Sequence, residues 1–227
     1  NPVERSTLPK LREDAERRVM TREEQALFMR YAKQTYYGDI FEVALSTGMR
    51  KGELLALEWS DVDFNNRMIH VTGTLIRVNS RYVKGTPKSK TSRRDIPMLD
   101  NVYAILRRRR RELLELKVKL GDKWTPLDGL DNLVFTNEFG SVVTLNTMQY
   151  YMRHIQDMIR RGGIEFEPIH IHTLRHTFAT RAIEAGMQPQ VLKTILGHSS
   201  LAMTMDLYSH VLPDTKTEEM QKIANLF

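Results

Sequence analysis

The most informative stretch of the sequence is residues 172–208, which read HTLRHTFATRAIEAGMQPQVLKTILGHSSLAMTMDLY. Glycines interrupt this stretch and divide it into expected helices at about 173–185, 189–196 and 201–209. The stretch therefore predicts a C-terminal third that is built from short helices.

Histidine, arginine and tyrosine side chains occur along this stretch at positions suited to a cleft. His172 and Arg175 are three residues apart, so both can leave one face of a helix together. His198 comes directly after a glycine, on a loop or at a helix start, where side chains point into clefts rather than into a core. Taken alone, each residue has a plainer explanation, since a single Tyr such as Tyr208 usually packs and a single His usually hydrogen-bonds at the surface. Their combination with a second segment favours a shared site.

The second segment is residues 46–54, STGMRKGEL, which places Arg50 after a glycine turn at the start of a helix. A guanidinium there can reach outward, and its planar fork matches the oxygens of a phosphate. A surface arginine paired with Glu53 is the alternative interpretation. The two interpretations are compatible, because Glu53 can support the site by orienting the guanidinium.

The rest of the sequence predicts helices around one small region of strands. Thr21 and Glu24 form a capping box for a first helix, and Thr144 can cap a later one. β-branched residues favour strands in the first half of the chain. The expected elements are helices at 21–34, 39–46, 100–120 and 144–162, strands at 67–78, 80–84 and 93–98, and a basic hairpin turn at 85–92. The predicted fold class is therefore mostly α with a small antiparallel β-sheet, that is, α+β.

The composition excludes several classes of protein. The 227 residues contain 34 Lys and Arg, 28 Asp and Glu and no Cys, and the formal net charge is +6. Without cysteine there is no disulfide, no thiolate nucleophile and no Cys-ligated zinc. The sequence contains no run of about 18 apolar residues, so it predicts no membrane span. The basic balance favours a polyanionic partner. The arginine run at 107–111 would go all round a helix, so a solvated helix surface is its favoured interpretation.

In this order, the motifs resemble the catalytic domain of tyrosine recombinases, in particular the integrases of temperate phages and conjugative transposons. The resemblance rests on TGMRKGEL at 47–54, HTLRH at 172–176, LGH at 196–198 and Tyr208, and it covers roughly residues 20 to 215. It implies the fold of that domain. It also implies a site-specific recombinase that cuts and rejoins DNA strands through a 3′-phosphotyrosine intermediate. Such enzymes integrate and excise a mobile element and need no metal, nucleotide or other cofactor.

The resemblance also assigns roles to residues. Tyr208 is implied as the nucleophile, and Arg50 and Arg175 as clamps on the scissile phosphate. His172 and His198 are implied as supporting imidazoles. These residue types suit the reaction, because a phenol with an ordinary pKa of about 10 needs help to ionise. Guanidiniums on the non-bridging oxygens would also stabilise the charge that develops at phosphorus.

The family carries a catalytic lysine on a β-hairpin, and here several residues qualify. In PKSKTSRRDIP, residues 87–97, Lys88 matches the family's lysine best, and Lys90 is the alternative because turn lengths vary. Such a lysine would protonate the leaving 5′-oxygen. Lys84, Lys88, Lys90 and Arg93 are expected to contact DNA. The lysines could instead serve only as phosphate contacts or as solvated surface residues.

The resemblance further implies partners and a plan of domains. Expected partners are double-stranded DNA with attachment or transposon-end sites, and further copies of the chain, as a tetramer at synapsis. An accessory excision factor or a host DNA-bending factor is also expected, in the cytoplasm of a bacterium, on nucleoid DNA and without a membrane. Residues 1–20 are expected to be a linker from an N-terminal core-binding domain, and residues 21–212 the catalytic domain. Residues 213–227 are expected to be a tail helix that docks on its own domain or on a neighbouring protomer.

Two other functions remain as alternatives. A non-catalytic basic DNA-binding module would keep the fold, although the presence of Tyr208 and both arginines counts against it. A metal-dependent nuclease would use the histidines, but the sequence offers no obvious Asp and Glu partners at ligand spacing. A covalent protein–DNA adduct that forms in EDTA would distinguish the recombinase from both.

Overall fold

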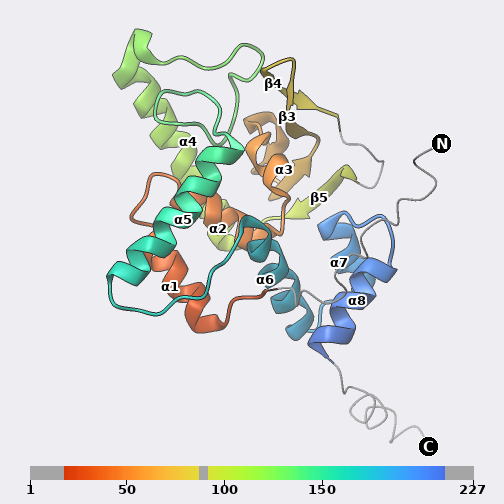
Figure 1. The fold of residues 1–227 in the computed structure, drawn as a ribbon. Helices are drawn as coiled ribbons and strands as arrows, with labels where there is room; N and C mark the ends of the chain where they lie inside the picture. Colours follow the sequence, from red (N-terminus) through yellow and green to blue (C-terminus); the bar gives the residue numbers. More distant parts are fainter. Residues whose placement is uncertain (1–17, 87–91, 213–227) are drawn as a thin grey trace, which may run out of the picture.

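The computed structural model describes residues 18–86 and 92–212, and the chain is mostly helical (Figure 1). The helices are α1 (Arg22–Ala32), α2 (Gly38–Thr47), α3 (Lys51–Leu55), α4 (Asp100–Leu120), α5 (Leu145–Arg161), α6 (Ile171–Glu184), α7 (Pro189–Leu196) and α8 (Ala202–Val211), with 3-10 turns at Trp59–Asp61 and Gly121–Lys123. The strands are β1 (Val62–Asp63), β2 (Met68–Val71), β3 (Thr74–Val78), β4 (Arg81–Gly85) and β5 (Arg94–Pro97). The predicted class, mostly α with a little antiparallel sheet, is confirmed. The expected tail helix at 213–227 and most of the expected linker at 1–20 lie outside the described residues.

Capping side chains begin two of the helices where the sequence predicts. The Glu24 amide donates to Thr21 Oγ1 at 3.1 Å, and the Thr21 amide donates to the Glu24 carboxylate at 2.8 Å. This reciprocal pair is the expected capping box, and α1 follows it. Thr144 Oγ1 accepts the amide of Thr147 at 3.0 Å and caps α5 in the same way.

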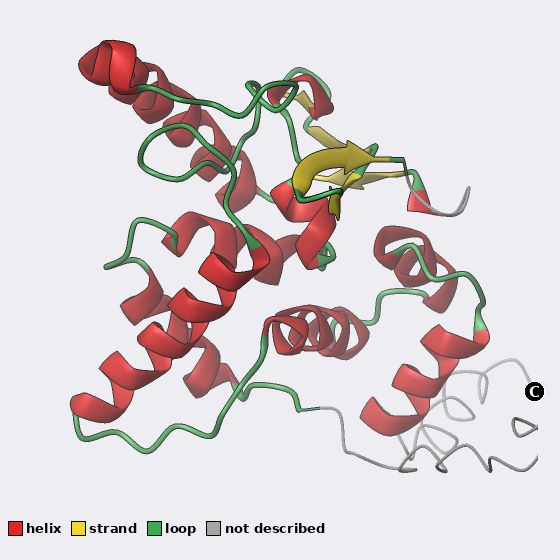
Figure 2. Ribbon diagram, turned by 45° about the horizontal axis from the view of Figure 1, so that its top comes forward, coloured by secondary structure: helices red, strands yellow, loops and turns green. Residues whose placement is uncertain are grey.

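The strands form two small sheets where the sequence predicts one. β2 lies between β1 and β5 in an antiparallel sheet, and β3 pairs with β4 in the other. Both sheets lie on the same side of the molecule (Figure 2). The single strand expected at 67–78 is therefore wrong, because Thr72 and Gly73 separate it into β2 and β3. A Cβ on Gly73 would lie 2.6 Å from the Lys84 side chain, so the chain turns at a residue without one.

The same topology corrects the expected hairpin at 85–92. β4 and β5 are consecutive strands, but β4 pairs with β3 whereas β5 pairs with β2. β4 and β5 therefore belong to different sheets and do not form a hairpin with each other. The alternation of β5 explains the pairing, because Arg94 and Ile96 are buried while Asp95 is exposed, and Ile96 lies opposite the buried Ile69.

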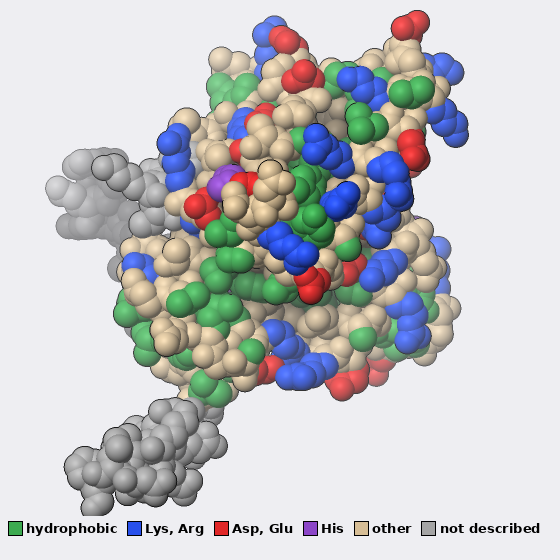
Figure 3. Space-filling view, turned by 180° about the vertical axis from the view of Figure 1, so that it is seen from behind, with side chains coloured by type: hydrophobic (Ala, Val, Ile, Leu, Met, Phe, Trp, Pro, Cys, Tyr) green, Lys and Arg blue, Asp and Glu red, His purple; other side chains and the backbone are tan. Residues whose placement is uncertain are grey.

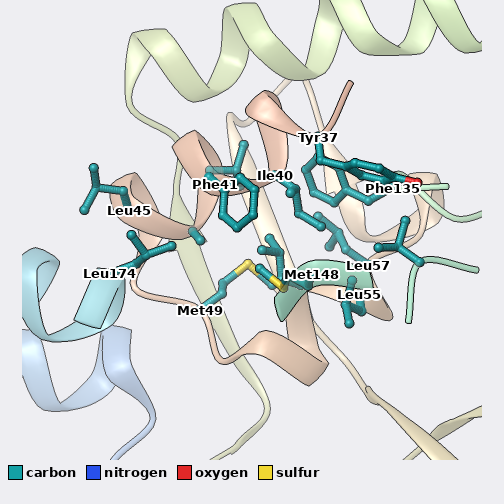
Figure 4. Packing of buried hydrophobic residues seen from close by; sticks show 14 of the residues in the cluster. Tyr37, Ile40, Phe41, Leu45, Met49, Leu55, Leu57, Phe135, Met148 and Leu174 are labelled. Atoms are coloured by element: carbon teal, nitrogen blue, oxygen red, sulfur yellow. The ribbon is translucent and has the colours of Figure 1, made fainter. Parts of the chain in front are cut away.

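The main hydrophobic core connects the helix that precedes Arg50 to the helix that carries Arg175. Phe41 and Leu45 belong to α2, and Leu174 belongs to α6, and all three are buried in one cluster. Figure 4 shows Leu174 next to Leu45, with Phe41 further along the same helix. Because such cores are close-packed, the relative position of α2 and α6 is fixed by this contact.

A second cluster holds the last three helices together. Its buried members include Ile183 of α6, Leu192 and Leu196 of α7, and Leu207 of α8. α7 and α8 lie side by side at one edge of the molecule (Figures 1 and 2). This cluster places the helix of Tyr208 against α6 and α7.

The arginine run at 107–111 contains a buried member. Arg109 is 5% exposed, and its Nε donates to the carbonyl of Val134 at 2.7 Å. Its Nη2 donates to the carbonyl of Thr136 at 3.4 Å, and the guanidinium lies 5.1 Å from the ring centre of Phe135. The solvated helix surface expected for the run is therefore wrong for Arg109, which supports the loop after α4.

Replacing Arg109 with Met is expected to lower the free energy of unfolding by about 2–4 kcal/mol, because two buried carbonyls lose their donor. Arg111→Met is the matched control, since Arg111 is exposed and its contact to Glu115 measures 3.8 Å. The control should change stability by no more than about 0.5 kcal/mol. Urea denaturation measures both, and similar losses for the two variants would contradict a structural role for Arg109.

The positive charge is spread out on the face seen in Figure 3. Lys and Arg side chains there are interspersed with acidic and apolar ones. Several surface arginines are paired, such as Arg108 with Asp39 and Arg160 with Asp157. The net charge of +6 is thus a poor guide to the site by itself. In the part of the chain that the structure describes, no helix has the length and apolar character needed to cross a membrane.

Candidate active site

Three guanidiniums meet at the C-terminal end of α7. Arg94 Nε, Arg175 Nη2 and Arg50 Nη2 donate to the successive carbonyls of residues 195, 196 and 197, at 2.5, 2.7 and 2.7 Å. The last carbonyls of a helix lack partners within it and carry the negative end of the helix dipole. This end of α7 therefore gathers cations that come from β5, from α6 and from the start of α3.

Gly48 allows the start of α3 to approach α6 and α7 closely. It ends α2 with a φ of 62°, and a Cβ at this position would lie 2.5 Å from Phe178 and 2.9 Å from Leu196. Its carbonyl accepts Nη1 of Arg175 at 2.6 Å. The expected glycine turn before Arg50 is present, and both its left-handed φ and its lack of a side chain are needed there.

Glu53 binds two of the three guanidiniums. Its carboxylate accepts Nη1 and Nη2 of Arg94 at 3.0 and 2.8 Å, and its Oε1 also accepts Nη1 of Arg50 at 2.9 Å. The Arg94 and Glu53 side chains are 2% and 6% exposed, so this ion pair is almost free of solvent. The Arg50 amide donates to Glu53 Oε2 at 2.8 Å, so the same carboxylate also caps α3.

The cluster has more positive than negative charge. Glu53 is the carboxylate that hydrogen-bonds these guanidiniums in the described part of the chain. Burial opposes the ionisation of Glu53, but the hydrogen bonds and charge of Arg94, together with Arg50, hold its pKa below the usual value. Burial, and then the charges of Arg50 and Arg94, lower the pKa of Arg175 to about 9. Arg175 is still charged at pH 7, and an anion beside it would relieve the repulsion.

His172 lies near these cations at the start of α6. Partial burial, followed by the charges of Lys51, Arg175 and Arg50, lowers the pKa of its imidazole. The ring is therefore mainly neutral at pH 7, where one nitrogen can accept a proton and the other can donate a hydrogen bond.

His198 is held by the helix that carries Tyr208. It follows Gly197, which ends α7 with a φ of 65°. The His198 side chain is buried, and its Nδ1 lies 2.9 Å from Oγ1 of Thr204. Thr204 is fully buried in the first turn of α8, so the imidazole and this helix are directly joined.

Tyr208 lies on α8 against the second hydrophobic cluster. The buried members of that cluster include Leu196, the residue whose carbonyl binds Arg175. Its Oη is buried and has no hydrogen-bond partner among the described residues. Burial raises the pKa of the phenol. The structure thus packs Tyr208 against the cluster formed by α6, α7 and α8, and no guanidinium hydrogen-bonds its hydroxyl in the part of the chain that is described.

Lys84 is paired with acidic residues. Its Nζ donates to Glu58 at 2.6 Å and to Asp61 at 2.8 Å, and its side chain is 19% exposed. Burial opposes the charge, but the two carboxylates raise the pKa of Lys84 above its usual value. In this arrangement Lys84 ties β4 to the turn at Trp59–Asp61.

Three other basic residues, Arg93, Lys88 and Lys90, are predicted to contact DNA. Arg93 is exposed just before β5. Lys88 and Lys90 lie outside the described residues, so the choice between them stays a prediction. Within the described ranges, no group of three or more His, Asp or Glu side chains is placed to hold a metal ion.

Comparison with known families identifies the domain. Residues 11–214 match the model of the phage integrase family. The chain belongs to the phage integrase family. The resemblance to the catalytic domain of tyrosine recombinases is confirmed by this match and by the relatives that follow.

Two curated relatives are similar over most of this phage integrase domain. A tyrosine recombinase XerC-like protein of Caldanaerobacter subterraneus subsp. tengcongensis is 30% identical over 197 residues, which cover 83% of this chain and 49% of that protein. The transposase from transposon Tn916 of Enterococcus faecalis is 31% identical over 213 residues, which cover 90% of this chain and 51% of that protein. The chain thus spans about half the length of these relatives.

Solved structures agree with this assignment. The Tn1549 transposon integrase in complex with a circular intermediate DNA superposes with a TM-score of 0.79 at 29% identity, over 94% of this chain and 68% of that chain. The catalytic domain of the bacteriophage HP1 integrase gives a TM-score of 0.55 at 22% identity, over 93% of this chain and 97% of that chain, and supports the fold alone. The predicted tyrosine recombinase fold is confirmed.

Two residues of this phage integrase site are missed by sequence reasoning. Arg94 reads as part of a basic segment, yet its alternation with the buried Ile96 could have placed it on the inner face of β5. Thr204 gives a weaker signal, because a threonine four residues before Tyr208 reads as an ordinary helix residue. Its role depends on contact with His198, which only the packing of α8 reveals.

Proposed function

We propose that this domain cuts and rejoins double-stranded DNA at specific sites through a covalent 3′-phosphotyrosine on Tyr208, and that it integrates and excises a mobile element. The observation that carries the proposal is the convergence of Arg50, Arg94 and Arg175, with their excess positive charge, beside the helix of Tyr208. Relatives described as a transposon transposase and as a DNA-bound transposon integrase support the same activity.

In the cutting step, Arg50 and Arg175 hold the two non-bridging oxygens of the scissile phosphate. Oη of Tyr208 attacks the phosphorus and loses its proton, and the bond from phosphorus to the 5′-oxygen breaks. The neutral His172 is suited to accept the phenolic proton, because its pKa is lowered by partial burial and by nearby cations. The guanidiniums stabilise the charge that develops on the phosphoryl oxygens, which is usually the largest contribution to such catalysis.

The leaving 5′-oxygen takes a proton from a lysine. Lys88 is our choice, with Lys90 as the alternative, on the sequence pattern before β5. In the joining step a 5′-hydroxyl from a partner strand attacks the phosphotyrosine, and the same groups act in reverse. One bond of similar energy replaces another, so strand exchange needs no external energy source.

The burial of the phenol bears on how the reaction starts. Tyr208 Oη has no hydrogen-bond partner among the described residues, and burial raises its pKa. DNA must therefore bring the scissile phosphate, held by Arg50 and Arg175, within reach of the phenol before the attack can occur. The guanidiniums would then lower the pKa that burial raises.

The wider assembly belongs to the proposal too. Exchange of both strands between two duplexes uses four tyrosines, which favours a tetramer on the paired sites. Residues 21–212 are the catalytic domain in this proposal, 1–20 a linker from a core-binding domain and 213–227 a tail helix. The protein would act on bacterial chromosomal DNA in the cytoplasm, with an accessory excision or DNA-bending factor.

A trapping assay tests the activity on DNA sites of many sequences at once. The substrate is a pool of duplexes with randomised flanks and a nick placed so that cutting releases a short fragment. Loss of the fragment traps the covalent intermediate. The chain should form an SDS-resistant adduct in EDTA, and sequencing of the trapped duplexes gives the preferred site.

Tyr208→Phe should abolish the adduct, because the ring remains while the nucleophilic oxygen is lost. Tyr150→Phe is the matched control, since Tyr150 is 56% exposed on α5, and this variant should react like the unchanged chain. An adduct that survives in Tyr208→Phe, or that needs a divalent metal, would contradict the proposed function.

A further inference from the structure

Arg94 is the most completely bound of the three guanidiniums in the site. Its Nε donates to the carbonyl of Ile195 at 2.5 Å, and Nη1 and Nη2 donate to the carboxylate of Glu53 at 3.0 and 2.8 Å. Nη1 also donates to the carbonyl of Ser92 at 3.2 Å. These bonds occupy nearly all N–H groups of the guanidinium, and the side chain is 2% exposed. Arg94 is therefore not available as a third clamp on a phosphate.

Arg50 and Arg175 keep more of their donors for a ligand. Among the described residues, the guanidinium of Arg50 donates to Glu53 and to one carbonyl, and that of Arg175 donates to two carbonyls. Each guanidinium has further N–H groups that these bonds do not use. The Arg50 side chain is also 36% exposed. The two arginines implied as clamps thus differ from Arg94 in what they offer to a phosphate.

Glu53 is shared between Arg94 and Arg50. Its Oε1 accepts Nη1 of both arginines, at 3.0 Å from Arg94 and at 2.9 Å from Arg50. Its Oε2 accepts Nη2 of Arg94 and the amide of Arg50, both at 2.8 Å. The carboxylate therefore fixes Arg50 at two points, and Arg94 fixes the carboxylate at both oxygens.

This sharing decides how much positive charge is left for a phosphate. A carboxylate that faced Arg50 alone would cancel most of the charge of that guanidinium, because the two groups are in contact. Arg94 is the more deeply buried partner and compensates Glu53 instead. After burial, the charges of Arg50 and Arg94 lower the pKa of Arg175, so the charge of Arg94 is felt at the other clamp as well.

The end of α7 is shaped around Arg94. Gly197 ends this helix with a φ of 65°, and a Cβ there would lie 3.0 Å from Nη1 of Arg94 and 3.2 Å from its Cδ and Cζ. The carbonyl of the same glycine accepts Nη2 of Arg50 at 2.7 Å. Arg94 thus contacts both groups that hold the Arg50 guanidinium, the Glu53 carboxylate and the backbone of Gly197.

We infer that Arg94 is a positioning residue that compensates Glu53, so that Glu53 orients Arg50 without cancelling the positive charge that Arg50 and Arg175 offer to a phosphate. Arg94 acts through these residues and does not itself contact the phosphate. The effect on reaction rate rests on the proposed function. The effect on anion binding does not, because it is a property of the folded chain without DNA.

Two variants test the inference through the sign of their combined effect. Arg94→Met leaves Glu53 paired with Arg50 alone, so adduct formation on the trapped duplex should slow about 10- to 100-fold, as for other groups that act through a ligand residue. Adding Glu53→Gln removes the uncompensated carboxylate, so the double variant should react about threefold faster than Arg94→Met, or more. Arg160→Met, which breaks the exposed pair to Asp157, is the matched control and should react like the unchanged chain.

A neutral substrate separates a loss of charge from a loss of folded protein. In a methylphosphonate duplex, a methyl group replaces one non-bridging oxygen of the scissile phosphate and removes its negative charge. Fewer folded molecules would slow the reaction on both duplexes by the same factor. If Arg94 preserves positive charge, Arg94→Met should slow the methylphosphonate at least about threefold less than the phosphate. Arg94→Lys keeps the charge but not the paired hydrogen bonds, and it should slow the phosphate less than Arg94→Met does.

Inorganic phosphate provides a readout that needs no reaction. It is titrated into the chain labelled with ¹⁵N-arginine, without DNA, and the Nε–H signals of Arg50 and Arg175 are followed by NMR. The dissociation constant should rise about threefold or more in Arg94→Met and fall again in the double variant. This pattern is expected even if no adduct forms, so failure of the proposed function can be told apart.

Three results would overturn the inference. One is an Arg94→Met variant that reacts within about twofold of the unchanged chain, or that is slowed equally on phosphate and methylphosphonate. Another is a double variant that reacts no faster than Arg94→Met. The third is an affinity for inorganic phosphate that is the same in all three chains, including no measurable binding to any of them.

Discussion

Arg175→Ala is expected to slow formation of the covalent adduct by about three orders of magnitude or more. Arg175 donates to the carbonyls of Gly48 and Leu196. Burial and the neighbouring guanidiniums lower its pKa to about 9, so its positive charge is poorly compensated until a phosphate binds. A single preorganised donor to a developing oxyanion contributes about 10²–10³ in rate, and an arginine on a transferring phosphoryl group about 10³–10⁵.

The measurement is the initial rate of SDS-resistant adduct on the trapped duplex. Arg175→Lys keeps the charge but cannot span the same geometry, so its rate should fall between those of the unchanged chain and the alanine variant. Arg160→Ala is the control, because Arg160 is a surface residue paired with Asp157. An alanine variant that folds and reacts within about tenfold of the unchanged chain would remove Arg175 from the mechanism.

Glu53→Gln is expected to produce the largest loss of stability among single charge changes in the site. It leaves Arg94, whose side chain is 2% exposed, without the carboxylate that accepts two of its hydrogen bonds. Breaking one partner of a buried ion pair costs about 3–5 kcal/mol. Asp157→Asn, which breaks the exposed pair to Arg160, should cost no more than about 1 kcal/mol.

The loss of unfolding free energy in Glu53→Gln should also depend on pH. The pKa of Glu53 lies below its ordinary value of 4.5, so the unfolded chain takes up a proton there more readily than the folded one. The stabilisation is therefore complete above pH 4.5 and declines as the pH falls towards the lowered pKa. Urea denaturation at about pH 7 and about pH 4 should show a smaller gap between Glu53→Gln and the unchanged chain at the lower pH.

A double variant separates the ion pair from other effects. Arg94→Met combined with Glu53→Gln removes both charges, so it should be less destabilised than the two single losses added together. Simple additivity, or a loss in Glu53→Gln no greater than in Asp157→Asn, would show that the buried pair does not organise the site.

The candidate site residues stand out in the sequence because they lie in short motifs. Arg50 sits behind Gly48, and His198 behind Gly197, and in both places a glycine with positive φ lets the following segment leave a helix end. Such turns can be recognised in the sequence. The carbonyls that receive the guanidiniums cannot, because Arg94 and Arg50 lie 101 and 147 positions from the carbonyls at the end of α7 that they bind.

The sheets and the role of Lys84 show where local patterns stop being sufficient. A strand-like run over 67–78 cannot reveal that β2 and β3 join different sheets, since strand pairing is decided by distant partners. Lys84 reads as one more basic residue before β5, but Glu58 and Asp61 pair with it across 26 and 23 residues. Sequence charge alone therefore does not separate a lysine that meets DNA from one that holds a strand.

The identity of the nucleophile is the central claim, and mapping the covalent bond tests it most directly. The SDS-resistant adduct is digested with nuclease and protease, and the peptide that carries the residual nucleotide is sequenced by mass spectrometry. A nucleotide attached to Tyr208 through its 3′-phosphate is the predicted result. A nucleotide on any other side chain, or attached through a 5′-phosphate, would contradict the account.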